Sequence, residues 1–417
     1  MRRTVFSRCV YRALLSACVL LVATATWSQS LTWLGTLGGS ESVAFSVSAD
    51  GSVVVGAARD AAGQRRAFRW TQATGMVDLG TLGGSESAAF GVSADSSVVV
   101  GVAEDAFGRE LAFQWQSSGD MQSLGTLGGL NSGAFGVSAD GSVVVGVARD
   151  AAERRRAFRW TQATGMVDLG TLGGSTSRAL GVSADGSVVV GVSLNATGQN
   201  VAFRWTPDNV LTGGMRSLGT LGGRESEALG VSADGSVVVG EARDAAGQRR
   251  AFRWTRATEM VDLGTLGGNE SAAFGVSSDG SAIVGAARDA AGQRRAFRWT
   301  LSGGIEDLNR TYADQLVDGS SLDTAYAISP DSRYIVGMGF NATTRRSEAF
   351  LLDTQPSCAA HNGDINNDRC VDDADLLQVL FAFGSTGSTL GRVDVNCDQV
   401  VDDADLLTVL FNFGAGC

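Results

Sequence analysis

The sequence predicts an all-β protein, a β-propeller built from seven four-stranded blades, followed by a small α-helical module. The first observation is a repeat, because Gly-Thr-Leu-Gly-Gly begins at intervals of 45, 45, 45, 49 and 45 residues, at Gly35, Gly80, Gly125, Gly170, Gly219 and Gly264. A fixed period of this length marks a repeat architecture. The second is that each copy contains four short apolar segments separated by turn residues. The third is a pair of acidic loops near the end of the chain, each followed by a helical pattern.

Composition excludes several classes of protein. The 417 residues include 56 Gly but only 3 Pro, which excludes collagen, and 44% are hydrophobic, which excludes global disorder. The formal charge of -11 argues against nucleic acid as a partner. A single histidine, His361, leaves no basis for a histidine-dependent catalytic triad or a His-ligated zinc site.

Residues 1–25 have the pattern of a secretory signal peptide. Four arginines precede the apolar run of residues 13–25, which ends in Ala23-Thr24-Ala25. We therefore expect a secreted protein, extracellular or at the cell surface. No later stretch approaches the roughly 20 apolar residues that a bilayer requires, so we expect no transmembrane segment after cleavage. An uncleaved membrane anchor is the alternative.

Within the repeat region, residues 26–353, each copy of about 45 residues is expected to form four strands. In the copy after Leu82 these are residues 87–93, 97–101, a third strand ending in Phe113 and Trp115, and residues 121–127, followed by a turn at a glycine pair. Most copies place Asp-Gly between the first two strands, which is a strong hairpin signal. Four strands per copy is the arithmetic of a propeller blade.

The two ends of the repeat region are out of phase with the copies. It begins with an isolated fourth strand, Leu31 to Leu37, and its seventh copy stops after a third strand at Leu352. Pairing residues 31–34 with residues 348–352 would complete the seventh blade, close the ring and remove the exposed sheet edges. We therefore expect a closed, monomeric propeller; an open β-solenoid is the alternative.

The repeated pattern resembles the extracellular HAF repeat family over residues 31–352. It runs Leu-Gly-Thr-Leu-Gly-Gly, Ser-x-Ala-Phe-Gly-Val-Ser-x-Asp-Gly, Val-Val-Gly and Ala-Phe-x-Trp. The histidine of the family name is replaced throughout, by Arg66, Leu111, Arg156, Val201, Arg250, Arg295 and Glu348. The resemblance therefore implies the fold, and no function follows from it.

After a short linker, residues 354–357, two loops in residues 358–417 have the spacing of calcium ligands. Oxygen ligands stand at positions 1, 3, 5, 9 and 12 of each twelve-residue loop, and position 7 offers a backbone carbonyl. The first loop supplies Asp364, Asn366, Asp368, Cys370, Asp372 and Asp375, and the second supplies Asp394, Asn396, Asp398, Val400, Asp402 and Asp405. The sequence therefore predicts two bound Ca²⁺ ions.

Each loop runs into an amphipathic pattern, Leu376, Val379, Leu380 and Phe383 in the first copy, which we interpret as mutual packing of two helices. Loop plus exit helix, twice, resembles a type I dockerin. That resemblance implies calcium-dependent folding and docking onto a cohesin-like partner. The pairs Asp373-Ala374 and Asp403-Ala404 stand where the family has the Ser-Thr type pair associated with cohesin recognition. The pattern thus favours metal binding over a cellulosomal cohesin.

Four cysteines remain after removal of the signal, all in the last sixty residues: Cys358, Cys370, Cys397 and Cys417. An even set on an exported chain predicts two disulfides. Three pairings are possible, and the sequence leaves them open.

The propeller region offers three candidate ligand features. Arginine pairs such as Arg65-Arg66 recur before the third strand and suggest a belt for an anionic partner, or local neutralisation by the nearby aspartates. The third-strand tryptophans suggest sugar stacking, or packing between blades. The seventh copy alone carries Tyr312, Tyr326 and Tyr334, which mark a possible ligand site or a drifted closing blade.

No catalytic residues are predicted, because near-identical copies lack the varied polar groups that an active site brings together. We expect a non-enzymatic binding or interaction protein that uses the dockerin-like module for docking and has an extracellular glycan as a possible ligand. The alternatives are a catalytic component of a polysaccharide-degrading system and a purely structural envelope protein.

Overall fold

The computed structural model describes residues 30–354, 362–366, 368, 370–386, 390–396 and 400–417, apart from residues 118, 208–213 and 318. The predicted signal peptide and residues 355–357 of the predicted linker lie outside the described residues. Gln29–Pro356 forms one compact unit, and Ser357–Cys417 belongs to a second.

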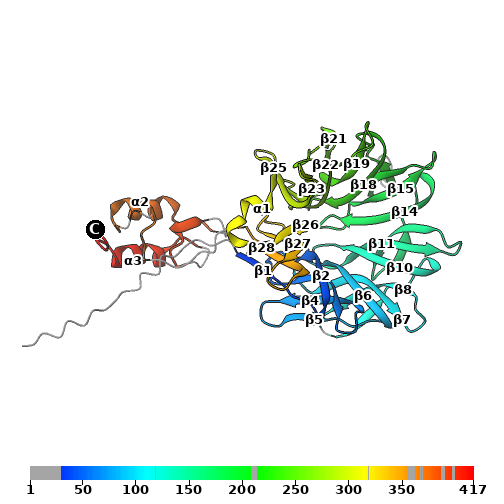
Figure 1. The fold of residues 1–417 in the computed structure, drawn as a ribbon, viewed down its shortest axis with the longest axis horizontal. Coiled ribbons are helices and arrows are strands. Elements are labelled where there is room, and N and C mark those ends of the chain that lie inside the picture. The colour runs from blue at the N-terminus through cyan, green and yellow to red at the C-terminus, as the bar shows by residue number, and fades with distance from the viewer. Residues whose placement is uncertain are drawn as a thin grey trace, which may run out of the picture. The chain divides into compact units, whose positions relative to one another are not determined.

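Within Gln29–Pro356 five repeats form separate four-stranded antiparallel sheets, the strands of the first and last repeats are joined in one eight-stranded sheet, and the repeats follow one another around a common centre (Figure 1). The first strands are β2 (Gly38–Val47), β6 (Gly83–Val92), β10 (Gly128–Val137), β14 (Gly173–Val182), β18 (Gly222–Val231), β22 (Gly267–Val276) and β26 (Ser321–Ile328). The second strands are β3 (Val54–Asp60), β7 (Val98–Asp105), β11 (Val143–Asp150), β15 (Val189–Asn195), β19 (Val237–Asp244), β23 (Ala282–Asp289) and β27 (Tyr334–Asn341).

The third strands are β4 (Arg65–Thr71), β8 (Glu110–Gln116), β12 (Arg155–Thr161), β16 (Asn200–Thr206), β20 (Arg249–Thr255), β24 (Arg294–Thr300) and β28 (Arg346–Asp353). The fourth strands are β5 (Gly75–Asp78), β9 (Met121–Ser123), β13 (Gly165–Asp168), β17 (Gly214–Ser217), β21 (Glu259–Asp262) and β25 (Gly304–Asp307). The predicted all-β class and the organisation of the repeats into four-stranded, propeller-like sheets are confirmed.

The last repeat has three strands of its own, β26, β27 and β28, and β1 (Ser30–Trp33) pairs antiparallel with β28. Trp33 lies opposite Phe350, with the two ring centroids 6.3 Å apart. A single parallel bridge between Glu41 and Ser347 joins β28 to β2. Each first strand contacts the first strand of the next sheet, and β26 contacts β2.

Two predicted boundaries were wrong. The glycine pair after Leu127, Gly128-Gly129, was expected to form a turn, but it begins β10, as the equivalent pair Gly83-Gly84 begins β6, and the fourth strand ends at Ser123 and not at Leu127. A Cβ on Gly84 would lie 2.6 Å from the carbonyl oxygen of Asp105, so this glycine permits close approach of the neighbouring strand. Positive φ angles occur at Gly80, +82°, and at Gly83, +108°.

The core lies between successive sheets. One phenylalanine of each third strand is fully buried: Phe68, Phe113, Phe158, Phe203, Phe252, Phe297 and Phe350. The residue opposite Phe68 is Gly56, where a Cβ would overlap the Val43 carbonyl and the Phe68 ring. The six third-strand tryptophans pack against these clusters, which confirms the packing interpretation for them.

A serine hydrogen bond links each of the first six repeats to the repeat before it in the ring. Ser132 Oγ donates to the carbonyl of Gly125 at 2.6 Å and accepts the N–H of Ala112, in the preceding sheet, at 2.9 Å. The same pair of bonds recurs at Ser42, Ser87, Ser177, Ser226 and Ser271. At Ser42 the N–H comes from Ala349, so this bond joins the first repeat to the last.

The seventh repeat carries a helical insertion that the strand pattern missed, α1 (Leu308–Thr311) and η1 (Ala313–Gln315). Asp307 caps α1 by accepting the N–H of Asn309. The Asn309 side chain donates to the carbonyl of Leu322 and accepts its N–H, which ties the insertion to β26.

The second unit contains α2 (Asp373–Ala382), η2 (Gly391–Val393) and α3 (Asp403–Phe411). Its small core is made mainly of valines, one pair from the helices and the others from the loops: Ile365, Val371, Val379, Val395, Val401 and Val409. The two loop–helix segments are near repeats of one another in sequence and in burial.

Candidate functional sites

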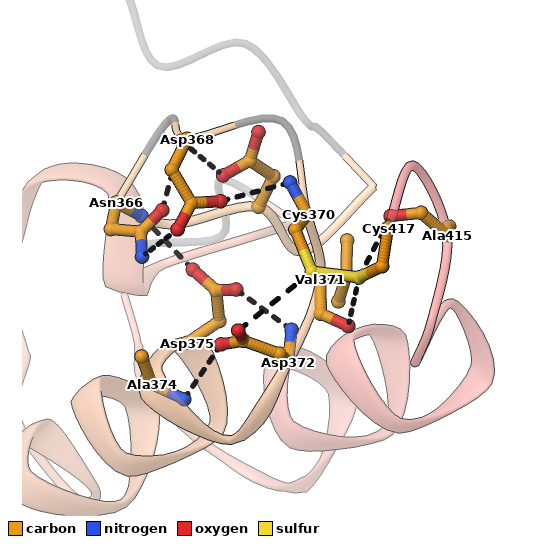
Figure 2. Close-up of a disulfide and its surroundings, with 10 residues drawn as sticks. Asn366, Asp368, Cys370, Val371, Asp372, Ala374, Asp375, Ala415 and Cys417 are labelled. Carbon is orange, nitrogen blue, oxygen red and sulfur yellow. Dashed lines mark hydrogen bonds between the residues drawn. A yellow bond between two sulfur atoms is a disulfide. The ribbon is translucent and has the colours of Figure 1, made fainter.

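Two buried aspartates organise the acidic loops. Asp375 is fully buried, and its Oδ1 accepts the backbone N–H groups of Ile365 at 2.7 Å and Asn366 at 3.0 Å. Its Oδ2 accepts the N–H of Asp372 at 3.0 Å, completing a capping box at the start of α2 (Figure 2). Asp405 repeats all three bonds in the second loop. Each position-12 carboxylate therefore folds its own loop back onto the helix that follows.

Other described residues of the first acidic loop accept backbone N–H groups of the same loop through their side-chain oxygens. Asn366 Oδ1 accepts the N–H of Asp368 at 2.9 Å, and Asp368 Oδ1 accepts the N–H of Cys370 at 2.9 Å (Figure 2). Asp364 and Asp394, the first residues of the two loops, are 8% and 4% exposed. Buried carboxylates are costly unless hydrogen-bonded, paired or bound to a cation.

The donor set of these loops fits calcium, because it consists of carboxylate, amide and carbonyl oxygens. Among the described residues, however, no three His, Cys, Asp or Glu side chains already lie as a metal-binding group. Asp372 and Asp402 serve as helix N-caps, accepting the N–H groups of Ala374 and Ala404. Asp398 lies outside the described residues, and Val400 forms a bridge with Thr386.

One disulfide, Cys370–Cys417, connects the first loop to the end of the chain across 47 residues (Figure 2). This pairing selects between the connectivities that the sequence left open. Cys358 and Cys397 lie outside the described residues.

The interpretation of the helix stripes as mutual packing was only partly right. Val379 and Val409 are fully buried, and Leu376 packs against the same core. Leu380 and Phe383, however, are 48% and 47% exposed, because the small core is filled by valines from the loops.

In the first unit, an arc of aromatic rings lines the centre of the propeller. Successive first strands contribute Phe135, Phe90, Phe45, Tyr326 and Phe274, with neighbouring ring centroids 5.2–5.3 Å apart. All seven first strands line the central cavity of about 210 Å³. Each aromatic residue, or its equivalent Leu180 or Leu229, sits at an irregularity in the strand register. Such β-bulges redirect a side chain, here towards the centre.

A second cavity of about 320 Å³, which we call the mouth cavity, opens beside this arc. Its apolar wall includes Phe90, Phe135, Val102 and Val147. Its charged residues are Arg65, Arg149, Arg155, Arg178 and Glu110. They come from four successive sheets, because the third strand of one sheet packs against the first strand of the next.

The two arginines of a pair have different surroundings. The second arginine of the pair is neutralised locally, as in the ion pairs of Arg66 with Asp60 at 3.2 Å and Arg295 with Asp289 at 3.2 Å. The first arginine, such as Arg65, faces a cavity. The structure thus supports local neutralisation for the second arginine, and it leaves Arg65 without an ion pair, whereas the equivalent Arg249 pairs with Glu241 at 3.4 Å.

The three tyrosines of the seventh repeat have different surroundings. Tyr312 is 1% exposed in the core beside α1, and burial raises its pKa. Tyr326 lies in the aromatic arc between Phe45 and Phe274. Tyr334 packs beneath the guanidinium of Arg333, with Cζ 4.8 Å from the ring centroid. Of the three, only Tyr326 lines the central cavity.

Sequence reasoning missed the first-strand aromatics and Arg178. A signal was present: the motif Ala-Phe-Gly-Val or a close variant recurs, and Leu180 and Leu229 replace phenylalanine in two adjacent repeats. In those same repeats Arg178 and Glu227 stand two positions earlier and form an ion pair at 2.8 Å. Burial raises the pKa of Glu227, although Arg178 opposes this effect.

No protein-family model and no curated protein matches this chain. Among solved structures, it is similar to TolB from Acinetobacter baumannii at 13% identity and a TM-score of 0.44, over 73% of this chain and 65% of that chain, less than two thirds of its length. Hydrazine synthase from Kuenenia stuttgartiensis is 11% identical with a TM-score of 0.46, over 77% and 97% of the two chains. Putative TolB from Agrobacterium tumefaciens is 14% identical with a TM-score of 0.42, over 63% and 87%.

The strand pairings, and not these similarities, define the fold of this chain. Among the described residues, no helix combines the length and the apolar character needed to cross a bilayer.

Proposed function

We propose that this chain is a secreted or cell-surface, non-catalytic binding protein, with a closed seven-bladed propeller and a dockerin-like module that docks in the presence of calcium. The proposal of a calcium-dependent docking module rests on the duplicated arrangement around Asp375 and Asp405. A fully buried carboxylate accepts three backbone N–H groups in each acidic loop. Two small loops with this charge density gain stability from bound cations, because an ion offsets the repulsion between neighbouring carboxylates.

Closure of the ring is supported by contacts between the first and last repeats. These are the pairing of β1 with β28, the contact of β26 with β2 and the hydrogen bond from Ala349 N–H to Ser42. A closed ring has no free sheet edges and behaves as a rigid scaffold for ligand binding at its centre.

Calcium would be held by side chains of the two loops, Asp364, Asn366, Asp368 and Asp375 in the first, with Cys370 offering a backbone carbonyl. The cation would supply charge neutralisation and cross-linking of each loop. The chain itself presets the loop ends through the capping boxes of α2 and α3.

The test is calcium-dependent protection of the second unit in the full-length protein. Hydrogen exchange followed by mass spectrometry reports on this unit and on the propeller through separate peptides. Tryptophan fluorescence would report on the propeller alone, because the second unit has no tryptophan. With a Kd of about 10⁻⁴ M for extracellular calcium modules, calcium at about 100 times Kd should stabilise each loop by about 2.7 kcal/mol. Protection should rise with calcium and fall with chelator.

The variant Asp364→Ala/Asp394→Ala should abolish the calcium response. The control Asp373→Asn/Asp403→Asn removes two carboxylates that are exposed and are not loop ligands, and it should keep the response. Equal protection in calcium and in chelator would refute the metal proposal. A purified cohesin-type domain should be captured in calcium and released by chelator, and turnover of a polysaccharide would refute the non-catalytic assignment.

A further inference from the structure

The mouth cavity combines an apolar wall with excess positive charge. Four arginines and one glutamate line it, beside the faces of Phe90 and Phe135. Its volume of about 320 Å³ lies at the lower end of the range for small-ligand pockets, about 300–1,000 Å³. The corresponding hollow beside Arg294, which the next-to-last repeat forms, measures only about 50 Å³.

Two of the arginines are not held in an ion pair. Among the described residues, the guanidinium groups of Arg65 and Arg155 make no hydrogen bond or ion pair. Arg65 lies over the Phe90 ring, with Cζ 5.9 Å from the centroid. Arg149 instead donates to the Glu153 carbonyl at 2.8 Å, so it is already engaged.

The strand register places like charges face to face at this rim. Arg59 lies directly opposite Arg65, and Arg149 directly opposite Arg155. Like charges in this arrangement destabilise a sheet, and the ion pairs of Arg59 with Glu41 at 2.8 Å and of Arg149 with Glu153 at 3.6 Å offset only part of the repulsion. Burial lowers the pKa of Arg65, and the neighbouring Arg59 contributes to that decrease, whereas Glu86, Glu110 and Glu41 oppose it. An anion bound beside Arg65 and Arg155 would relieve this repulsion.

The apolar part of the cavity is open because of one glycine. Gly133 occupies the first-strand position that carries Arg178 and Glu227 in later repeats. A Cβ there would meet only ordinary contacts, the nearest being Phe135 Cζ at 3.6 Å. The backbone at Gly133 has no positive φ, so nothing in the fold requires glycine at this position. The missing side chain therefore leaves room for a ligand.

We propose that the mouth cavity binds a carboxylate attached to an apolar group, with the carboxylate at the arginines of the cavity, Arg155 above all, and the apolar group against Phe90, Phe135 and the space above Gly133. Arginine suits this role because its planar guanidinium bonds carboxylates with two parallel N–H groups. The inference builds on the proposed binding function and names its ligand class. The source is either the C-terminus of an apolar peptide or a small apolar acid.

The experiment measures binding to the full-length protein by calorimetry and ligand-observed NMR. The probes are N-acetyl-phenylalanine, its carboxamide, acetate, and a longer peptide with a free C-terminal phenylalanine. We expect N-acetyl-phenylalanine to bind with a Kd of about 1 mM or tighter, and the carboxamide and acetate to bind at least about tenfold more weakly. Tighter binding of the longer peptide identifies a peptide C-terminus as the source, and equal binding identifies a small acid.

Three variants test the geometry. Arg155→Gln should weaken binding about tenfold or more without lowering the melting temperature, because it removes a like-charge pair. Gly133→Val should abolish binding by filling the cavity, while tryptophan fluorescence shows an intact fold. The matched control Arg294→Gln alters the same strand position beside the smaller hollow and should leave binding unchanged.

Equal affinity for the carboxylate and the carboxamide would overturn the proposal, as would full binding by Gly133→Val or no binding of any probe. Calcium-dependent protection of the second unit is measured on the same samples. If that protection persists while the probes fail, the ligand assignment is wrong and the docking function stands.

Discussion

The hydrogen bond between Ser42 and Ala349 offers a direct test of ring closure. Ser42→Ala removes an acceptor for the Ala349 N–H, 2.8 Å away, and a donor to the Gly35 carbonyl, 2.5 Å away. Ala349 is fully buried, so its N–H cannot turn to water, whereas Gly35 is only half-buried and its carbonyl can. A buried donor without a partner costs about 1–3 kcal/mol. We therefore expect the free energy of unfolding to fall by about 2 kcal/mol.

The loss of stability in Ser42→Ala should be compared with the loss in Ser132→Ala. Ser132 makes the same two bonds between adjacent repeats in the middle of the chain, so its loss should cost a similar amount. Urea unfolding followed by tryptophan fluorescence reports on the propeller, and Ser40→Ala is the control, because Ser40 is exposed on the same strand as Ser42. In an open chain of sheets Ser42 would have no partner from the last repeat. A loss of less than about 0.5 kcal/mol for Ser42→Ala, like that of a surface change, would refute closure.

Three further predictions concern local interactions. Asp375→Asn should destabilise the second unit by about 2 kcal/mol, because an amide nitrogen cannot accept the N–H groups bonded to one of the carboxylate oxygens; calorimetry against the exposed control Asp373→Asn checks this. Cys417→Ser should lower the stability of that unit by about 4 kcal/mol, since the bond to Cys370 closes a 47-residue loop; unchanged protection from hydrogen exchange would contradict it. Hydrogen bonding, chiefly from the Ser138 hydroxyl, lowers the pKa of Asp140 from 3.8 to about 2. This carboxylate stabilises the folded state above pH 3.8, and the contribution is lost as the pH falls towards 2. Melting temperature should therefore decrease over that interval, and Asp140→Asn should flatten the decrease.

Much of the fold is predictable from the sequence because the repeat makes each local signal recur. The Asp-Gly hairpins, the valine-rich second strands and the aromatic pairs such as Phe113 and Trp115 identify strands by local chemistry. The glycine pairs were misassigned for a physical reason. Gly84 is required by the close approach of the carbonyl of Asp105, and a sequence cannot distinguish that need from a turn.

The candidate sites divide in the same way. The acidic loops could be predicted because their ligands lie within twelve residues of one another, and the pattern includes Asp375. That Asp375 accepts three backbone N–H groups could not be predicted. The exposure of Phe383 was missed because helical spacing says which residues share a face, and not whether the unit has enough core to cover that face.

The sequence by itself determined the all-β class, the period, the strand order within a repeat and the two acidic loops, since each depends on residues close together in the chain. Tertiary structure decided the disulfide Cys370–Cys417, the aromatic arc and the mouth cavity. Those features assemble residues from different repeats or distant loops, such as Arg65, Phe135 and Arg178, and their distances depend on how the sheets pack around the centre. Local propensity carries no information on that packing. Near-identical repeats have the same local preferences, and their surroundings differ only because the residues of the adjacent repeats differ.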